Sequence, residues 1–168
     1  MPRSMIIIPV LATCVFACKE PAPKANPGLD ETAVKKEVQE LMNKYGDWGR
    51  QSQYDSIAGL YHKNGASFVN FQKTEYASFD SIKASYKDAD SIAFFTWNNP
   101  LIIDVISSDV ATVAGDYLLR SKSITDTLHF NYSAVLVKDG NAWKIKQENE
   151  MPDITSAKKI AALLEKNN

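Results

Sequence analysis

The sequence lacks several features on which large classes of proteins depend. Its 168 residues contain two cysteines, Cys14 and Cys18, so the rest of the chain offers no pair for a disulfide and no thiolate cluster for zinc. It has no metal-ligand spacing, no glycine-rich phosphate loop, no Ser-nucleophile motif and no internal repeat. Lys and Arg number 19 against 20 Asp and Glu, which gives no basic excess for nucleic acid. We therefore expect no metal, no cofactor and no nucleic-acid partner.

No apolar run is long enough to span a bilayer, because the longest, residues 5–16, is only a short stretch behind Arg3. Such a stretch is typical of a cleaved export signal. Its end, Val15-Phe16-Ala17-Cys18, resembles the lipobox of bacterial lipoproteins. The resemblance implies that residues 1–17 are removed and that Cys18 is lipidated. A competing box ends at Cys14, but it has Thr13 before the cysteine and leaves a very short apolar stretch.

Residues 18–29 are rich in proline and poor in apolar side chains, so we expect an extended tether. By resemblance to envelope sorting rules, Lys19 after the lipidated cysteine favours the outer membrane. The expected location is the bacterial cell envelope, with a lipid anchor. Residues 30–151 are enough for one domain with a sizeable core, and residues 152–168 read as a C-terminal amphipathic helix.

Apolar spacing predicts an α+β domain. Helical periodicity follows Asp30, a good N-cap, and recurs over residues 54–61 and after Ser78. The remaining segments alternate or are rich in β-branched and aromatic residues, and turn residues separate them. The predicted strands are residues 66–71, 94–97, 101–106, 110–121, 128–138 and 142–150.

This order of elements resembles the nuclear transport factor 2-like superfamily, in its SnoaL-like branch. The resemblance is carried by residues 54–61 (YDSIAGLY), 109–115 (DVATVAG) and 139–145 (DGNAWKI). It implies a cone-shaped, cystatin-like fold with three helices over a curved antiparallel sheet, a deep pocket between them, and often a dimer packed through the outer sheet face. The fold alone does not give the function, because the superfamily contains isomerases, cyclases, dehydratases, hydrolases and plain binding domains.

Strand alternation predicts which side chains face the pocket, because residues two apart share a face. In the last strand, Trp143 and Ile145 point inward, and regular alternation adds Gln147 and Asn149 to that row. Applied to the other strands, the same alternation predicts that no acid, base or histidine faces the interior. Aromatic rings and amides of this kind are typical of a small-ligand site. The predicted ligand-binding residues are Trp97, Asn99, Tyr117, Phe130, Tyr132, Trp143, Gln147 and Asn149.

No catalytic residue is assigned by this pattern. In similar SnoaL-like chains the last strand commonly supplies histidines, where this chain has Gln147 and Asn149, and this argues against proton-transfer catalysis. One alternative stays open: a bulge in a long strand would turn Asp116, His129 and Glu148 inward as an acid/base set. Four further polar residues on or beside the helices are within reach of a cavity, but they read first as exposed helix-end charges. These are Asp47, Asp55, His62 and Glu75.

The expected function is therefore a lipid-anchored envelope domain that binds a small, partly apolar molecule and forms a homodimer. A cofactor-free SnoaL-like enzyme of isomerase, cyclase or dehydratase type is the alternative. A third possibility is an assembly module without a pocket.

The lipobox predicts the effect of one substitution. Cys18→Ser should abolish partitioning into the detergent phase and leave an unprocessed precursor, because the modified thiol is lost. Mass spectrometry of the wild-type N-terminus checks the site. Recovery of a mature chain that begins with lipid-modified Cys14 would contradict the choice of Cys18.

Overall fold

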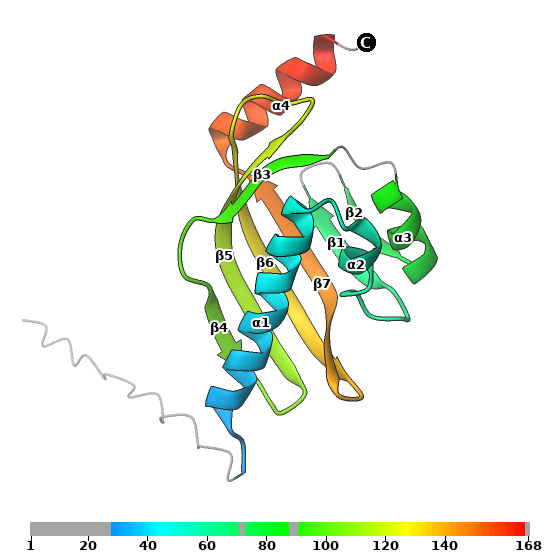
Figure 1. Ribbon diagram of the computed structural model, residues 1–168, viewed down its shortest axis with the longest axis vertical. Helices are drawn as coiled ribbons and strands as arrows, with labels where there is room; N and C mark the ends of the chain where they lie inside the picture. The colour runs from blue at the N-terminus through cyan, green and yellow to red at the C-terminus, as the bar shows by residue number, and fades with distance from the viewer. Residues whose placement is uncertain (1–27, 71–72, 88–90, 167–168) are drawn as a thin grey trace, which may run out of the picture.

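The computed structural model describes residues 28–70, 73–87 and 91–166, so the predicted signal, Cys18 and most of the tether lie outside the described residues. A curved sheet of seven strands is covered on one face by α1, with α2 and α3 beside it (Figure 1). In the described part of the chain no helix is both long and apolar enough to cross a membrane. The helices are α1 (Glu31–Arg50), α2 (Tyr54–Ala58), α3 (Phe79–Lys87) and α4 (Ile154–Lys166). The strands are β1 (Ala66–Asn70), β2 (Thr74–Ala77), β3 (Ile92–Trp97), β4 (Ile102–Val105), β5 (Val110–Ser121), β6 (Leu128–Asp139) and β7 (Ala142–Pro152).

The predicted fold class is confirmed. The strands follow the order β2-β1-β7-β6-β5-β3, and β4 also pairs with β5. All pairs are antiparallel except β1 with β7, so the sheet is mixed where the sequence suggested an antiparallel one. Strand β2 was not predicted, because its four residues precede the cap of α3 and carry no clear alternation.

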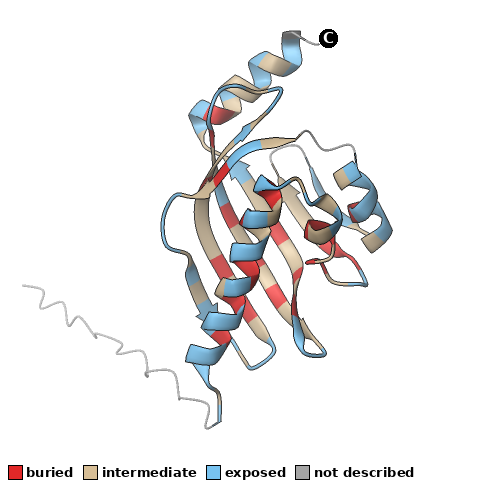
Figure 2. Cartoon of the chain, viewed as in Figure 1, coloured by how far each residue is buried: buried red, intermediate tan, exposed pale blue. Residues whose placement is uncertain are grey.

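Helix α1 provides most of the cover over the sheet. Asp30 caps it, since its carboxylate accepts a hydrogen bond from the backbone N–H of Ala33 at 3.0 Å. The apolar face predicted from the helical spacing is buried on the sheet (Figure 2). Val38 and Met42 are fully buried, and burial of each such side chain contributes roughly 1.5–3 kcal/mol. This packing holds α1 at a fixed height above the inner face of the sheet.

Strand β7 contains a β-bulge. Leu136 of β6 pairs with Ile145 of β7. The preceding residue, Val135, pairs with Gln147, and Lys146 is therefore an extra residue in β7. An extra residue turns every later side chain of the strand to the opposite face. The bulge thus divides β7 into two halves of opposite alternation.

One side of β7 pairs with β6 throughout. On the opposite side the pairing partner changes, and the bulge lies at that change. Ile145 exchanges backbone hydrogen bonds with residues 60–62, which follow α2. Two residues later the neighbour is β1, which starts its pairing at Ser67. Lys146 lies at this change of partner, and its ammonium donates to the carbonyl of Gly65 at 2.9 Å. The bulge therefore allows one strand to pair with two separate segments along the same edge.

The second half of β7 presents its acids to the interior. Glu148 and Glu150 lie under the helices, and Glu148 is only 3% exposed. Gln147 and Asn149 lie on the outer face, where the Asn149 amide donates to the Ser133 hydroxyl at 2.9 Å. The prediction that Gln147 and Asn149 face inward is wrong, because it assumed a regular strand.

Helix α4 is anchored at its first turn. The Asp153 carboxylate accepts from the backbone N–H of Ser156 at 2.6 Å, and the buried Ser156 hydroxyl accepts from the backbone N–H of His129 at 2.8 Å. Beyond this turn the helix projects past the end of the sheet, as Figure 1 shows. Ile154 and Leu164 are exposed, so part of its apolar side is uncovered in the described domain.

The outer sheet face carries exposed apolar side chains as well as charges. Ile102 is 70% exposed and Met151 44%, and Val135 and Val137 lie on the same face. Apolar area on an exposed face is commonly an interface. We therefore expect the chain from residue 29 to sediment as a dimer at micromolar concentration, and Ile102→Lys to shift it toward monomer without unfolding it. A wild-type chain that sediments strictly as a monomer would contradict the dimer.

Candidate functional site

The two acids on the inner face of β7 lie at the centre of a ring of tyrosines. Glu148 and Glu150 are two residues apart on one face, so their Cα atoms are about 7 Å apart along the strand. Helices α1 and α3 each contribute a tyrosine to this ring, and another tyrosine follows α2. The tyrosines around the two carboxylates are Tyr45 of α1, Tyr61 after α2, Tyr86 of α3, Tyr117 of β5 and Tyr132 of β6.

Glu148 is the deeper of the two acids. The hydroxyl of Tyr61 donates to its Oε2 at 2.5 Å, and that hydroxyl also lies 3.0 Å from the hydroxyl of Tyr86. Its other oxygen, Oε1, is buried and has no hydrogen-bond partner among the described residues. The buried hydroxyl of Tyr132 likewise makes no hydrogen bond of ordinary geometry with a described residue, but it lies beside Glu148 and lowers the pKa of that carboxyl. A third such atom, Oδ1 of Asn149, lies on the outer face, so it is the position of the other two beside an acid pair that marks this part of the interior.

Glu150 lies at the wall of a cavity. Its Oε1 accepts from the hydroxyl of Tyr117 at 2.9 Å and from that of Tyr45 at 3.4 Å. The cavity has a volume of about 170 Å³. An apolar cavity of roughly 150 Å³ holds benzene in another protein, so this one suits a ligand of single-ring size. It is lined by Tyr45, Gly49, Ile57, Tyr86, Ile92, Phe95, Tyr117, Leu119 and Glu150.

Burial dominates the electrostatics of this pair. It raises the pKa of Glu148 to about 8, the negative charge of Glu150 adds to the rise, and the hydrogen bond from Tyr61 opposes it. Burial also raises the pKa of Glu150, against the hydrogen bonds from Tyr117 and Tyr45. Within the described residues neither carboxylate forms an ion pair with a lysine, arginine or histidine. The pair therefore retains a proton near neutral pH and titrates as one unit.

The surrounding phenols stay protonated. Burial raises the pKa of Tyr61, Tyr117 and Tyr132, and the nearby charges of Glu148 and Glu150 raise it further. Each of these hydroxyls is consequently a hydrogen-bond donor over the physiological pH range. The site combines two acids that can exchange protons with donors that do not ionise.

The predicted aromatic lining faces the interior. Trp97 makes edge contacts with Tyr117 and Tyr132, at ring-centroid distances of 5.7 and 5.3 Å, and Phe130 stacks on Tyr117 at 5.2 Å. Trp143 is buried at the other end of the sheet, where its indole N–H donates to Glu37 at 2.7 Å. Their roles in ligand binding stay predictions, since only Tyr117 among them borders the cavity.

The predicted amides lie elsewhere. Asn99 is exposed, and its amide donates at 2.9 Å to Asp116 on the outer face. It follows β3 in a bend, so the alternation used to place it does not extend to it. Gln147 and Asn149 were turned outward by the bulge. The structure thus replaces three predicted amides with two carboxylates.

The bulge alternative is correct for one residue and wrong for the other two. Glu148 is turned inward. Asp116 and His129 stay on the outer face, where Oδ2 of Asp116 lies 2.7 Å from Nε2 of His129. The reason is that the bulge lies in β7, whereas β5 and β6 pair without interruption from Val110 to Leu119. On the outer face, His129 also lies 3.4 Å from Asp153 at the start of α4.

The other acid/base candidates lie away from the cavity. Asp47 pairs with Arg50, and Glu75 pairs with Lys73 at 2.7 Å. His62 is engaged locally, since its Nδ1 accepts from the backbone N–H of Asn64 at 3.1 Å. Asp55 is exposed and lies 3.9 Å from Lys83.

Sequence reasoning missed Glu148 and Glu150 as a pair, but one signal pointed to them. Tyr117 and Tyr132 were expected to face inward, and Tyr45 and Tyr61 recur at helical positions on the covering side. So many buried phenols need acceptors, and carboxylates accept better than amides. Phe95 was also missed as a lining residue, although it shares a face with Trp97 in β3.

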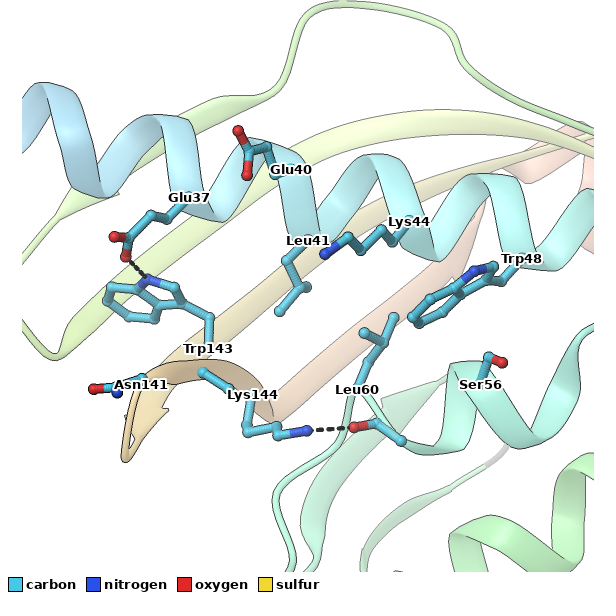
Figure 3. Close-up of a pocket in the computed structure, with 12 residues that line it drawn as sticks. Glu37, Glu40, Leu41, Lys44, Trp48, Ser56, Leu60, Asn141, Trp143 and Lys144 are labelled. Atoms are coloured by element: carbon cyan, nitrogen blue, oxygen red, sulfur yellow. Dashed lines mark hydrogen bonds between the residues drawn. The ribbon is translucent and has the colours of Figure 1, made fainter.

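A larger hollow lies on the surface between α1 and the β6–β7 hairpin (Figure 3). Its volume is about 480 Å³, and Trp48 and Leu60 border it. Two of its charged groups are already partnered: Glu37 by Lys138 and Trp143, and Lys144 by the carbonyl of Gly59. We favour the smaller cavity as the functional site, because Glu150 lines it and Glu148 lies two residues away on the same face of β7.

No protein-family model and no curated protein matches the chain. Solved structures share its fold. An NTF-2 like protein of unknown function from Shewanella oneidensis MR-1 has a TM-score of 0.59 and 17% identity, over 70% of this chain and 98% of that one. A type 2 hexachlorocyclohexane dehydrochlorinase has a TM-score of 0.59 and 14% identity, over 74% and 88%. A ketosteroid isomerase-like protein from Erwinia carotovora atroseptica has a TM-score of 0.59 and 10% identity, over 70% and 95%. These similarities show the cystatin-like fold of NTF2-like proteins.

The raised pKa of Glu148 predicts how stability depends on pH. The carboxyl has a pKa of about 8 when folded against an ordinary value of 4.5, so the folded state holds its proton more tightly. The stabilisation is complete below pH 4.5 and is lost as the pH rises to about 8. At about 1.4 kcal/mol per pH unit, the free energy of unfolding should fall by a few kcal/mol across this range. Glu150 acts in the same direction, because burial raises its pKa too.

Glu148→Gln should flatten most of this dependence, because an amide keeps the shape but cannot ionise. Urea unfolding at several pH values measures it. Glu40→Gln, at an exposed position of α1, is the matched control and should unfold with the wild-type pH profile. An unchanged pH dependence in Glu148→Gln would show that this carboxyl is not the group that titrates.

Proposed function

We propose that this chain is a lipid-anchored envelope protein whose domain takes a compact, partly apolar molecule into the cavity beside Glu150 and exchanges a proton with it, without a cofactor. The observation that carries the proposal is the pair of inward acids, Glu148 and Glu150, buried among phenols and without an ion pair to any described lysine, arginine or histidine. Titratable pairs whose environment shifts their pKa values are typical of acid/base sites. The dehydrochlorinase and isomerase names of two similar structures are consistent with such chemistry on this fold.

In this proposal Glu150 is the base, because it borders the cavity. Its carboxylate removes a proton from a carbon of the ligand, and the electron pair of that C–H bond moves into the ligand. Burial makes the carboxylate a stronger base, since it raises the pKa. The proton then returns to another carbon, which is an isomerisation, or a leaving group departs, which is an elimination. The hydroxyls of Tyr117 and Tyr45 hold Glu150 in place throughout.

Glu148 serves as the second acid. It keeps its proton near neutral pH, so it limits the negative charge of the pair to about one. The hydroxyl of Tyr132 lies beside Glu148, where it lowers the pKa of that carboxyl, and Tyr132 is not among the residues that line the cavity.

Plain ligand binding is the second candidate. It is favoured by the two phenol hydroxyls already bound to Oε1 of Glu150, which suit a fixed hydrogen-bonding group as well as a base. In that case a bound ligand would raise the melting temperature by mass action, and no bond would change. The pocketless assembly module is the least supported, because the cavity of about 170 Å³ lies at the acid pair.

Exchange of carbon-bound hydrogen for deuterium tests the proton transfer. Cyclopentanone, a neutral carbon acid, and 1,4-dimethylpyridinium, a cationic one, serve as probes in D₂O, followed by proton NMR. The wild-type chain from residue 29 should accelerate exchange of at least one probe over buffer. Glu150→Gln should reduce that acceleration by roughly 10²-fold or more, the usual contribution of a general base.

Gln147→Leu is the matched control, because Gln147 neighbours the pair in β7 but lies on the outer face. It should keep the wild-type exchange rate. Wild-type exchange no faster than buffer with both probes, or full activity in Glu150→Gln, would contradict proton transfer.

A further inference from the structure

We infer that the ligand of this cavity is a compact organic cation, an amine or ammonium compound, which Glu150 holds against a wall with four aromatic residues. The inference rests on the proposed ligand site and names the charge that its ligand carries. It is drawn from three features: the charge balance of the interior, the composition of the cavity wall, and the buried polar atoms left without partners.

The charge balance is the first argument. Glu148 and Glu150 are both enclosed by the covering helices and the sheet, and their hydrogen bonds come from neutral phenols. No described lysine, arginine or histidine forms an ion pair with either. A buried carboxylate without a counter-ion is costly, whereas a paired one is much less so. A cation in the cavity would supply the missing counter-ion directly beside Glu150.

The wall of the cavity is the second argument. Of the nine described residues that line it, four are aromatic and one, Glu150, is charged. The aromatic members are Tyr45, Tyr86, Phe95 and Tyr117. Aromatic rings attract cations electrostatically, most strongly where water is excluded, and they are the usual walls of sites for ammonium groups. An aromatic wall with one carboxylate is therefore complementary to an organic cation in both shape and charge.

The unpartnered buried atoms are the third argument. The hydroxyl of Tyr132 and the Oε1 of Glu148 each belong to a side chain only 3% exposed, and each lacks a hydrogen-bond partner in the described structure. The nearby charges of Glu148 and Glu150 act on Tyr132, which shows that this hydroxyl lies in the acid cluster. Neither residue is among those that line the cavity, so these acceptors strengthen the negative potential behind Glu150 and do not contact the cation directly.

Anionic ligands are disfavoured by the same geometry. The hydroxyls of Tyr61, Tyr117 and Tyr45 are directed at the carboxylates, so an added negative charge would meet repulsion with few donors to stabilise it. Removal of a proton from a neutral ligand by Glu150 has the same difficulty, because it moves the negative charge from the carboxylate to the ligand, where few donors stabilise it. Removal of a proton from a cation by Glu150 neutralises both partners, a change that a low-dielectric interior favours.

A matched pair of probes tests the charge of the ligand. Isobutylamine, protonated at neutral pH, and isobutanol have the same shape and fit a cavity of single-ring size. Titration of the wild-type chain from residue 29, followed by NMR chemical shifts, should show binding of the amine at least tenfold tighter than that of the alcohol. Glu150→Gln should abolish this preference, while Gln147→Leu should retain it.

The wild-type comparison decides the question even if Glu150→Gln fails to fold. Glu150→Asp then serves as the second variant, since it keeps the charge and should keep the preference with weaker binding. Equal binding of amine and alcohol by the wild type, or a preference that survives in Glu150→Gln, overturns the inference. If cyclopentanone exchange is still accelerated in that case, the proposed proton transfer stands with a neutral ligand. If neither probe binds and no exchange is accelerated, both fail.

Discussion

The extra residue in β7 is the constraint on which the interior of this protein depends. Strand β7 pairs first with the segment after α2 and then with β1. The extra residue, Lys146, lies between the two pairings. The direct consequence is chemical, because the residues after the bulge change faces. Without it the interior would hold amides and the carboxylates would be in solvent. The change of pairing partner along one side of β7 therefore determines the charge of the core.

An interior of this kind has a cost in stability. Two acids enclosed by phenols oppose folding whenever both are ionised, and the unpartnered oxygen of Glu148 adds a desolvation penalty. The core around them has the opposite character: Val38, Met42 and Ile145 are fully buried and apolar. Proteins keep such locally unfavourable groups where function requires them and the rest of the fold can compensate. This contrast is the physical reason for placing function at the acid pair.

Much of the fold followed from the sequence because it is set by local patterns. The apolar face of α1, the cap at Asp30 and the long alternating strands β5 and β6 depend on residues close together in the chain, and these predictions are confirmed. The candidate site was harder to predict, because the direction of Glu148 depends on which segment pairs with Ile145 and which with Gln147. Those partners lie some 80 residues earlier, where no local pattern refers to β7. The five phenols were the available clue, since they need acceptors that the predicted interior lacked.

The parallel pairing of β1 with β7 also bears on how the molecule forms. The hydrogen bond from Tyr61 to Glu148 joins residues 87 positions apart, and β1 has its inner neighbour only once the last strand is in place. Contacts between such distant residues require closure of a large loop, and proteins rich in them fold slowly. On a ribosome, helices α1 to α3 and strand β1 would emerge long before β7 and would wait without their central partner. The acid pair and its phenols can therefore come together only after β7, late in the described chain, has reached the helices that precede β1 and β3.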